Sequence, residues 1–329
     1  MTAARALDRL KTLDGYRKHF MDAALWRPFV SAACRANGQE CAQVRPGLAG
    51  TFPTFLVDER CVVKFFGPLF DGESCYRVEQ EAAGIVAGMD LPTARLLAAG
   101  TLAEEPQWNY LIFAYIPGVS LGAVPDRLSL EARLALARQM GEWVRQMHRA
   151  ALPTGTQLPR LTLEGMQAWF RARWPQERTK WPDHLRRAVP EYLERNAGWI
   201  QSDASHFIHA DLTQDHLLGD LAGGRWQTRA VIDFGDAMLG NLTYDLVALQ
   251  LDLFDCDRRL LRAFLESYGW QPDPDFVPKA MTTSLLHQFD VYAHLFAWKP
   301  ALAKAETLEE LAERIWNFDH RGEHEDLAG

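Results

Sequence analysis

The segments HFIHADLTQDHLLGD (206–220) and RAVIDFGDAMLGNLTYD (229–245) decide the fold of this 329-residue chain. Each joins an apolar run to a polar cluster, and residues typical of turns lie between the runs: Gly219, Asp220, Gly223 and Gly224. The pattern predicts a β-hairpin. Because the start of the first strand in an antiparallel pair lies beside the end of the second, we expect His216 and Asp233 to be neighbours, with Asp211 above them.

These three side chains follow the order found in a kinase-type phosphoryl-transfer site. Such a site needs one carboxylate that accepts a hydroxyl proton and two further ligands for the cations that neutralise the phosphates. Here Asp211 precedes His216 by one short loop, and the second strand ends in Asp-Phe-Gly at 233–235. An ordinary hairpin with a polar rim is the alternative, because Asp and Gly are common at strand ends for turn reasons alone.

HADLTQDHLL followed by VIDFGDAMLGNLTYDL resembles the catalytic segment of the aminoglycoside phosphotransferase family, which includes choline kinases and is related to protein kinases. The resemblance extends loosely over residues 45–255. It implies an α+β, two-lobed protein-kinase-like fold, with a small β-rich N-lobe and a larger, mainly helical C-lobe. It also implies that Asp211 is the catalytic base, that Asp233 binds the metal, and that His209 and Asp245 brace the loop.

One position differs from the family pattern. Where such kinases carry Asn as the second metal ligand, this chain has His216. The resemblance implies ATP as the nucleotide, with GTP as the alternative, and Mg²⁺ as the ion. Because imidazole is a poorer ligand than oxygen for Mg²⁺, Mn²⁺ is the alternative ion.

Composition narrows the class of partner. A net charge of −8 argues against nucleic acid and is compatible with a cationic substrate. The sequence has no run of about 18 apolar residues, and its start lacks the apolar core of a signal peptide. Five scattered cysteines fit reduced thiols. We therefore expect a cytoplasmic protein with no membrane partner; these features do not decide between a monomer and a dimer.

The first lobe is predicted from strand patterns. Residues 1–36 should form one or two helices that pack on this lobe. Residues 54–57 and 61–66 have strand character, with a hairpin tip at 58–60 between them, and Lys64 lies inside the second strand.

The following segment has the periodicity of a helix. Its apolar stripe consists of Val78, Ala82, Ile85 and Met89. Glu81 falls on this face, while Glu79 is predicted to point away. Because a carboxylate buried alone would cost several kcal/mol, Glu81 and Lys64 are predicted to pair. The alternative is that the Glu81 side chain extends to the rim of the helix. By the family resemblance, this pair holds the lysine on the nucleotide phosphates.

Further nucleotide contacts are expected around the first lobe. Backbone amides near Gly50 and Thr51 could approach a phosphate. In the family, the linker between the lobes meets the adenine ring, which assigns Phe113 and Tyr115 to nucleotide binding. The predicted division of the chain is 1–113 for the N-lobe, 114–119 for the hinge and 120–329 for the C-lobe.

The region 151–205 is rich in tryptophan: Trp169, Trp174, Trp181 and Trp199. Aromatic faces could stack on a sugar or cover a cation. Large aromatic residues at helical spacing more often belong to the core, which is the interpretation we favour.

The leading hypothesis is an ATP-dependent phosphotransferase that acts on a hydroxyl of an aminoglycoside-, sugar- or amino-alcohol-like molecule. A kinase-like protein that binds nucleotide with weak or no turnover is the second hypothesis, motivated by His216. A metal-dependent hydrolase is the third, since the polar cluster could also hold a first-row metal: His209, Asp211, Asp215, His216 and Asp233.

Overall fold

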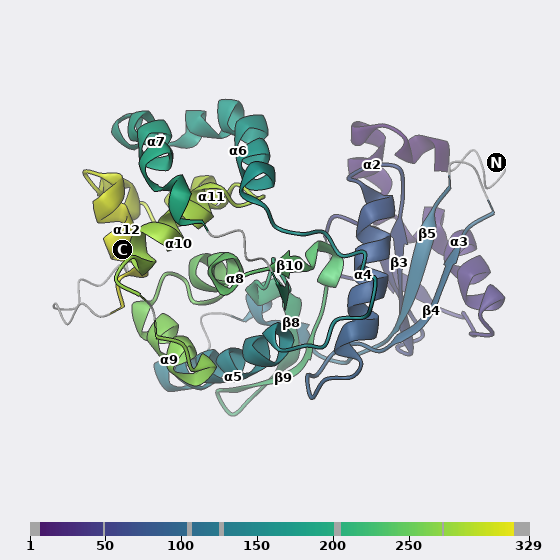
Figure 1. Ribbon diagram of the computed structural model, residues 1–329. Helices are drawn as coiled ribbons and strands as arrows, with labels where there is room; N and C mark the ends of the chain where they lie inside the picture. Colours follow the sequence, from purple (N-terminus) through teal and green to yellow (C-terminus); the bar gives the residue numbers. More distant parts are fainter. Residues whose placement is uncertain are drawn as a thin grey trace.

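A computed structural model describes residues 7–48, 50–103, 107–124, 128–200, 205–271 and 273–318. Figure 1 shows a lobe built around one sheet beside a larger, mostly helical lobe. The predicted two-lobed α+β fold is therefore confirmed. No helix in the described ranges is long and apolar enough to cross a membrane.

An antiparallel five-stranded sheet forms the N-lobe, in the order β1-β2-β3-β5-β4. Its strands are β1 (Val44–Pro46), β2 (Thr54–Val57), β3 (Cys61–Phe66), β4 (Leu96–Thr101) and β5 (Asn109–Ala114). The bounds of β2 and β3 match the prediction. Asp58 and Glu59 adopt φ of 51° and 53° in the tight tip between these strands.

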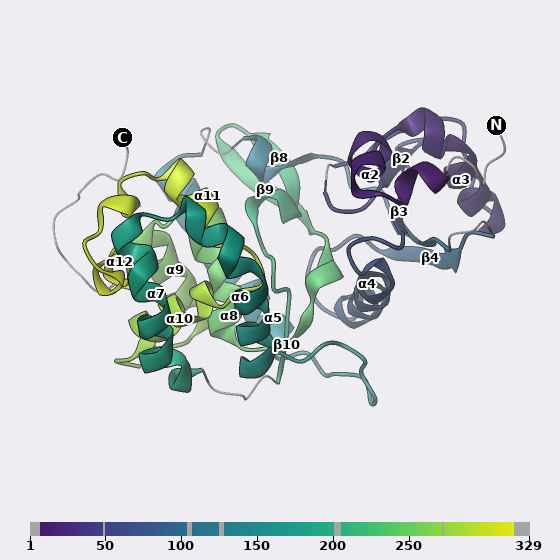
Figure 2. The ribbon, with the colours of Figure 1, turned by 90° about the horizontal axis from the view of Figure 1, so that it is seen from above.

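Helices cover both faces of this sheet (Figures 1 and 2). The N-terminal helices are η1 (Asp8–Leu10), α2 (Leu13–His19) and α3 (Ala23–Ala36). Trp26 of α3 contacts Phe65 with ring centroids 4.7 Å apart, in one buried cluster. Phe66 alternates to the opposite face, where α4 (Gly72–Val86) packs. The predicted packing of the N-terminal helices on the first lobe is confirmed.

Eight α-helices build the described C-lobe: α5 (Leu130–His148), α6 (Leu163–Glu177), α7 (Asp183–Asn196), α8 (Leu242–Ala248), α9 (Arg258–Tyr268), α10 (Phe276–Leu285), α11 (Val291–Trp298) and α12 (Leu308–Trp316). Ser129 caps α5 by accepting a hydrogen bond from the Ala132 amide at 3.2 Å. Gly269 ends α9 in the left-handed region, with φ of 79°. A single large core joins these helices.

Short strands carry the decisive segment into this lobe. They are β6 (Val119–Ser120), β7 (His206–Ile208), β8 (Leu217–Ala222), β9 (Arg225–Val231) and β10 (Met238–Gly240). The β8–β9 hairpin is confirmed, but its predicted turn is too long. Gly219 and Asp220 lie within β8, and only Gly223 and Gly224 turn the chain, with φ of 59° and 75°. Two successive positive φ values are typical of a two-residue hairpin.

The tryptophans belong to the core, as favoured from the sequence. Trp181 is buried and packs edge-to-face on Phe296, with ring centroids 5.0 Å apart. Trp169 and Trp174 are partly buried against the same cluster. The side chain of Trp199 lies outside the described part of the structure.

Candidate active site

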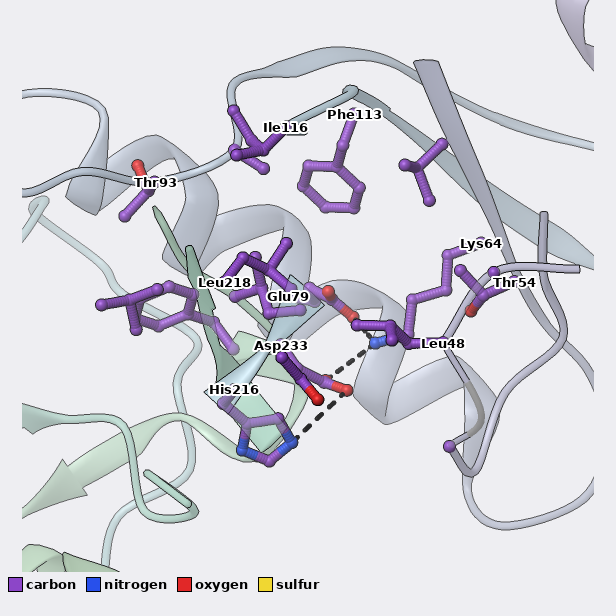
Figure 3. Close-up of a pocket in the computed structure, with 18 of the residues that line it drawn as sticks. Leu48, Thr54, Lys64, Glu79, Thr93, Phe113, Ile116, His216, Leu218 and Asp233 are labelled. Atoms are coloured by element: carbon purple, nitrogen blue, oxygen red, sulfur yellow. Dashed lines mark hydrogen bonds and ion pairs between the residues drawn. The ribbon is translucent and has the colours of Figure 1, made fainter. Parts of the chain in front are cut away.

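A cavity of about 510 Å³ lies where the two lobes meet (Figure 3). The N-lobe contributes Lys64 and Phe113, and the C-lobe contributes Leu218 and Asp233. The end of the β8–β9 hairpin therefore faces the strand that carries Lys64, as a kinase-like site requires.

Lys64 joins the two lobes through two carboxylates. Its Nζ donates to Glu79 Oε2 at 2.7 Å and to Asp233 Oδ1 at 2.8 Å. The side chains of Lys64 and Glu79 are only 9% and 5% exposed, whereas that of Asp233 is 37% exposed. Asp233 is thus the member of the trio that remains open to a ligand.

The predicted partner of Lys64 was wrong: Glu79 pairs with it, and Glu81 does not. Glu79 lies on the face of α4 that also buries Ala83 and Val86, four and seven residues further on. The sequence analysis placed the apolar stripe of this helix through Ile85 instead. The expected inner face therefore did not include Glu79. Glu81 is half-buried on the other side and binds residues 156–157.

The opposite charges in this trio keep Lys64 and Asp233 ionised. Burial disfavours the ammonium form of Lys64, but Asp233 and Glu79 outweigh this effect and hold its pKa above the usual range. Burial raises the pKa of Glu79 to about 7. Burial also acts to raise the pKa of Asp233, yet Lys64 and His216 lower it well below the usual range. Asp233 therefore stays a carboxylate at neutral pH.

The loop that carries Asp211 is braced from three sides. Ala210 adopts φ of 68°, and its amide donates to Asp245 Oδ1 at 2.7 Å. Asp245 Oδ2 in turn contacts His148 Nε2 at 3.0 Å. Burial lowers the pKa of His209 to about 4, so its neutral ring donates from Nε2 to the Ile232 carbonyl at 3.1 Å. These contacts match the bracing roles expected of His209 and Asp245.

Asp211 and Asp233 both lie within reach of His216. His216 Nε2 is 4.0 Å from Asp233 Oδ2, and its Nδ1 is 3.9 Å from Asp211 Oδ2. The expected convergence of the three side chains is confirmed. Burial raises the pKa of Asp211 to about 7, against the opposing effect of His216. A carboxylate with a pKa near neutral is suited to accept a proton from a hydroxyl.

The donor set fits a cation that is also bound by phosphate. His216 Nδ1 donates to the Asp211 carbonyl, which directs the second nitrogen, Nε2, toward Asp233. Asp233 and Asp211 raise the pKa of His216 against burial, so a proton can balance the charge when no ion is bound. Within the described ranges, no three His, Cys, Asp or Glu side chains form a complete metal site. Phosphate and water oxygens would have to supply the remaining ligands, as is usual for Mg²⁺.

Five of the six residues assigned to nucleotide binding line the cavity, and Glu81 does not: the five are Gly50, Thr51, Lys64, Phe113 and Tyr115. The Thr51 carbonyl accepts a hydrogen bond from the Tyr16 hydroxyl at 2.7 Å, which ties this loop to α2. Apolar walls from both lobes, such as Val62 and Leu218, were not predicted as contacts. In the sequence, both residues appear only as members of apolar runs with strand character.

The fold and this arrangement of charges define the chain as a kinase-like phosphotransferase. Residues 47–279 match the model of the phosphotransferase enzyme family, and the chain belongs to that family.

Solved structures with a similar fold include aminoglycoside and spectinomycin phosphotransferases. Wild-type aminoglycoside 2'-phosphotransferase-IIIa in its GDP complex superposes with a TM-score of 0.65 at 19% identity, covering 90% of this chain and 99% of that one. Spectinomycin phosphotransferase in complex with ADP and spectinomycin superposes with a TM-score of 0.55 at 14% identity, covering 82% of this chain and 91% of that one.

A curated relative comes from Arabidopsis thaliana. Lysine-specific demethylase JMJ21 is 22% identical over 274 residues. The match covers 64% of this chain and 29% of that protein. This chain therefore corresponds to less than a third of the length of that relative.

Proposed function

We propose that this protein transfers the γ-phosphoryl group of ATP to a hydroxyl of a small molecule. The observation that carries the proposal is Lys64, which binds Glu79 of the N-lobe and Asp233 of the C-lobe at the wall of the cavity. Such a lysine, held by a carboxylate on the neighbouring helix, is the phosphate anchor of kinase-type sites. Gly50, Thr51, Phe113 and Tyr115 would contact the nucleotide.

Each charged side chain then has a role. Asp211 orients the hydroxyl and accepts its proton at a carboxylate oxygen, for which a pKa of about 7 is suited. Lys64 binds phosphate oxygens, while Asp233 and His216 hold a divalent ion. That ion, when bound, neutralises negative charge on the phosphates. Placement and charge neutralisation account for most of the catalysis, because the phosphoryl group of ATP is already activated.

The proposed acceptor is an aminoglycoside-, sugar- or amino-alcohol-like molecule. Asp236 and Asp252 lie close enough to Asp211 to raise its pKa. Three neighbouring carboxylates favour a cationic acceptor, in line with the net charge of −8. Structures of this fold include complexes with GDP, ADP and ATP, so GTP is the alternative nucleotide. We also propose that the protein is cytoplasmic and that residues 1–113 form the N-lobe, 114–119 the hinge and 120–329 the C-lobe.

His216 supports a second candidate, a kinase-like protein that binds nucleotide but turns it over slowly. An imidazole in place of an oxygen ligand weakens the fit to Mg²⁺ and favours Mn²⁺. A metal-dependent hydrolase is less well supported, because it gives the buried Lys64–Glu79 pair no role.

A screen of ADP release tests these alternatives. Purified protein is supplied with ATP, or with GTP while GDP release is measured in place of ADP release. Each nucleotide is combined with Mg²⁺ or Mn²⁺ and with panels of aminoglycosides, sugars, amino alcohols and hydroxy amino acids. The proposed function predicts ADP release that depends on one acceptor class and is lost in Asp211→Asn. Nucleotide binding without ADP release for any acceptor would favour the second candidate. Hydrolysis of a substrate without nucleotide would favour the hydrolase.

A further inference from the structure

The segment 150–161, here called the strap, connects α5 to α6 and extends out of the C-lobe to α4. Figure 1 shows this connection reaching α4, and Figure 2 shows it projecting past β10 on the side of α4. Connections between consecutive helices are commonly two to about eight residues long, shorter than this one. The detour brings the C-lobe into contact with the helix that carries Glu79.

The strap is fixed to the C-lobe at one end. The Leu161 amide donates to the Leu239 carbonyl at 2.8 Å, and the Leu239 amide donates to the Pro159 carbonyl at 2.7 Å. Leu239 belongs to β10, which follows the Asp-Phe-Gly turn directly. Residues 159–161 of the strap are therefore hydrogen-bonded to the strand that follows Asp233.

Glu81 fixes the tip of the strap to α4. Both carboxylate oxygens accept from the Gln157 amide, at 3.2 Å and 3.1 Å, and Oε1 also accepts from the Thr156 hydroxyl. Gly155, with φ of 79°, turns the chain so that both donors face the helix. Next to them, Leu158 is buried in one cluster with Ala82 of α4.

These contacts close a ring around the site. Inside the cleft, Glu79 and Asp233 are joined through Lys64. Outside it, α4 and β10 are joined through Glu81 and the strap. Because Glu79 and Glu81 are separated by one residue on a rigid helix, a rotation of α4 that breaks one connection strains the other.

We propose that Glu81 is a positioning residue whose carboxylate, by binding the strap, holds α4 so that Glu79 keeps Lys64 in place for the nucleotide phosphates. The proposal rests on the proposed function, since it assumes that Lys64 binds phosphate. It gives Glu81 a role in the N-lobe different from the pairing with Lys64 that the sequence predicted.

The test compares ATP with adenosine in the full-length protein. Lys64 acts on phosphates, and adenosine has none. In Glu81→Ala and Thr156→Val, the Kd for Mg·ATP should rise about five- to tenfold, the size of effect expected from the net loss of one ordinary hydrogen bond, while the Kd for adenosine stays unchanged. Thr156→Ser keeps the hydroxyl and should bind ATP as the wild type does. Gln80→Ala, an exposed neighbour on α4, serves as the matched control.

Hydrogen exchange of residues 72–86 supplies a readout that does not depend on nucleotide. Faster exchange is expected in Glu81→Ala but not in Gln80→Ala. Equal loss of ATP and adenosine affinity, or unchanged ATP affinity, would overturn the positioning role. Wild-type protein that binds no nucleotide would instead refute the proposed function. In that case unchanged exchange in α4 would still overturn the contact between Glu81 and the strap.

Discussion

Replacing Glu79 by Gln tests how Lys64 is held. The change keeps the size of the side chain and an acceptor oxygen but removes its charge. A hydrogen bond to a charged group contributes about 1.5–3 kcal/mol, and removing one partner of a fully buried ion pair costs about 3–5 kcal/mol. Lys64 keeps Asp233 at 2.8 Å in this variant. We therefore expect the free energy of unfolding to fall by about 2 kcal/mol, within the first range and below the second, because the lysine retains one carboxylate partner.

The assay is a double-mutant cycle in urea between Glu79→Gln and Lys64→Met. The two side chains are 9% exposed or less, so solvent screens their interaction weakly, and a coupling energy of about 2 kcal/mol is expected. A parallel cycle between Gln80→Ala and Lys64→Met serves as the control and should give almost no coupling, because Gln80 is exposed on α4. Independent sites show apparent coupling energies of up to about 0.5 kcal/mol. A coupling energy below this value between Glu79 and Lys64 would refute the assignment of Glu79 as the partner of Lys64.

Three further predictions concern the site and its surroundings. Asp211→Asn should lower kcat by about 10²–10⁴ while the Kd for ATP stays unchanged, as measured by steady-state kinetics and calorimetry; a kcat near wild type would exclude Asp211 as the base. His216→Asn should lower the ratio of Mn²⁺- to Mg²⁺-supported kcat/KM about tenfold, and an unchanged ratio would exclude His216 as a metal ligand. Burial lowers the pKa of His287 to about 3, so the folded state binds its proton less readily than the unfolded state does. Between pH 6.5 and 5 this histidine should therefore cost about 2 kcal/mol of stability as the pH falls. Urea titrations of His287→Gln should show a flatter pH dependence, and a slope equal to wild type would contradict a buried neutral ring.

Local patterns were enough to predict much of the fold. The bounds of β2 and β3 follow from apolar runs separated by three turn residues, and both match the structure. The hairpin register placed His216 beside Asp233 because antiparallel pairing leaves little freedom at the strand ends.

Other features depend on contacts between distant parts of the chain. The inner face of α4 was misassigned because Val78 fits either of two stripes, through Ile85 or through Val86. The face that carries Glu79 is selected by the packing of Ala83 on the N-lobe sheet, beside Phe66 and Phe113. The contact between Glu81 and the strap joins residues 75 and 76 positions apart, and no local pattern marks it. His148 could be assigned to the core from its helix, but its contact with Asp245 requires the folded lobe.

Transfer of a radiolabelled γ-phosphate from ATP tests the central claim most directly. With an acceptor identified by the ADP-release screen, the label should appear on that acceptor with wild-type protein and should not appear with Asp211→Asn. Label released only as inorganic phosphate, or transferred equally well by Asp211→Asn, would contradict the claim that Asp211, Lys64 and Asp233 form a phosphotransferase site.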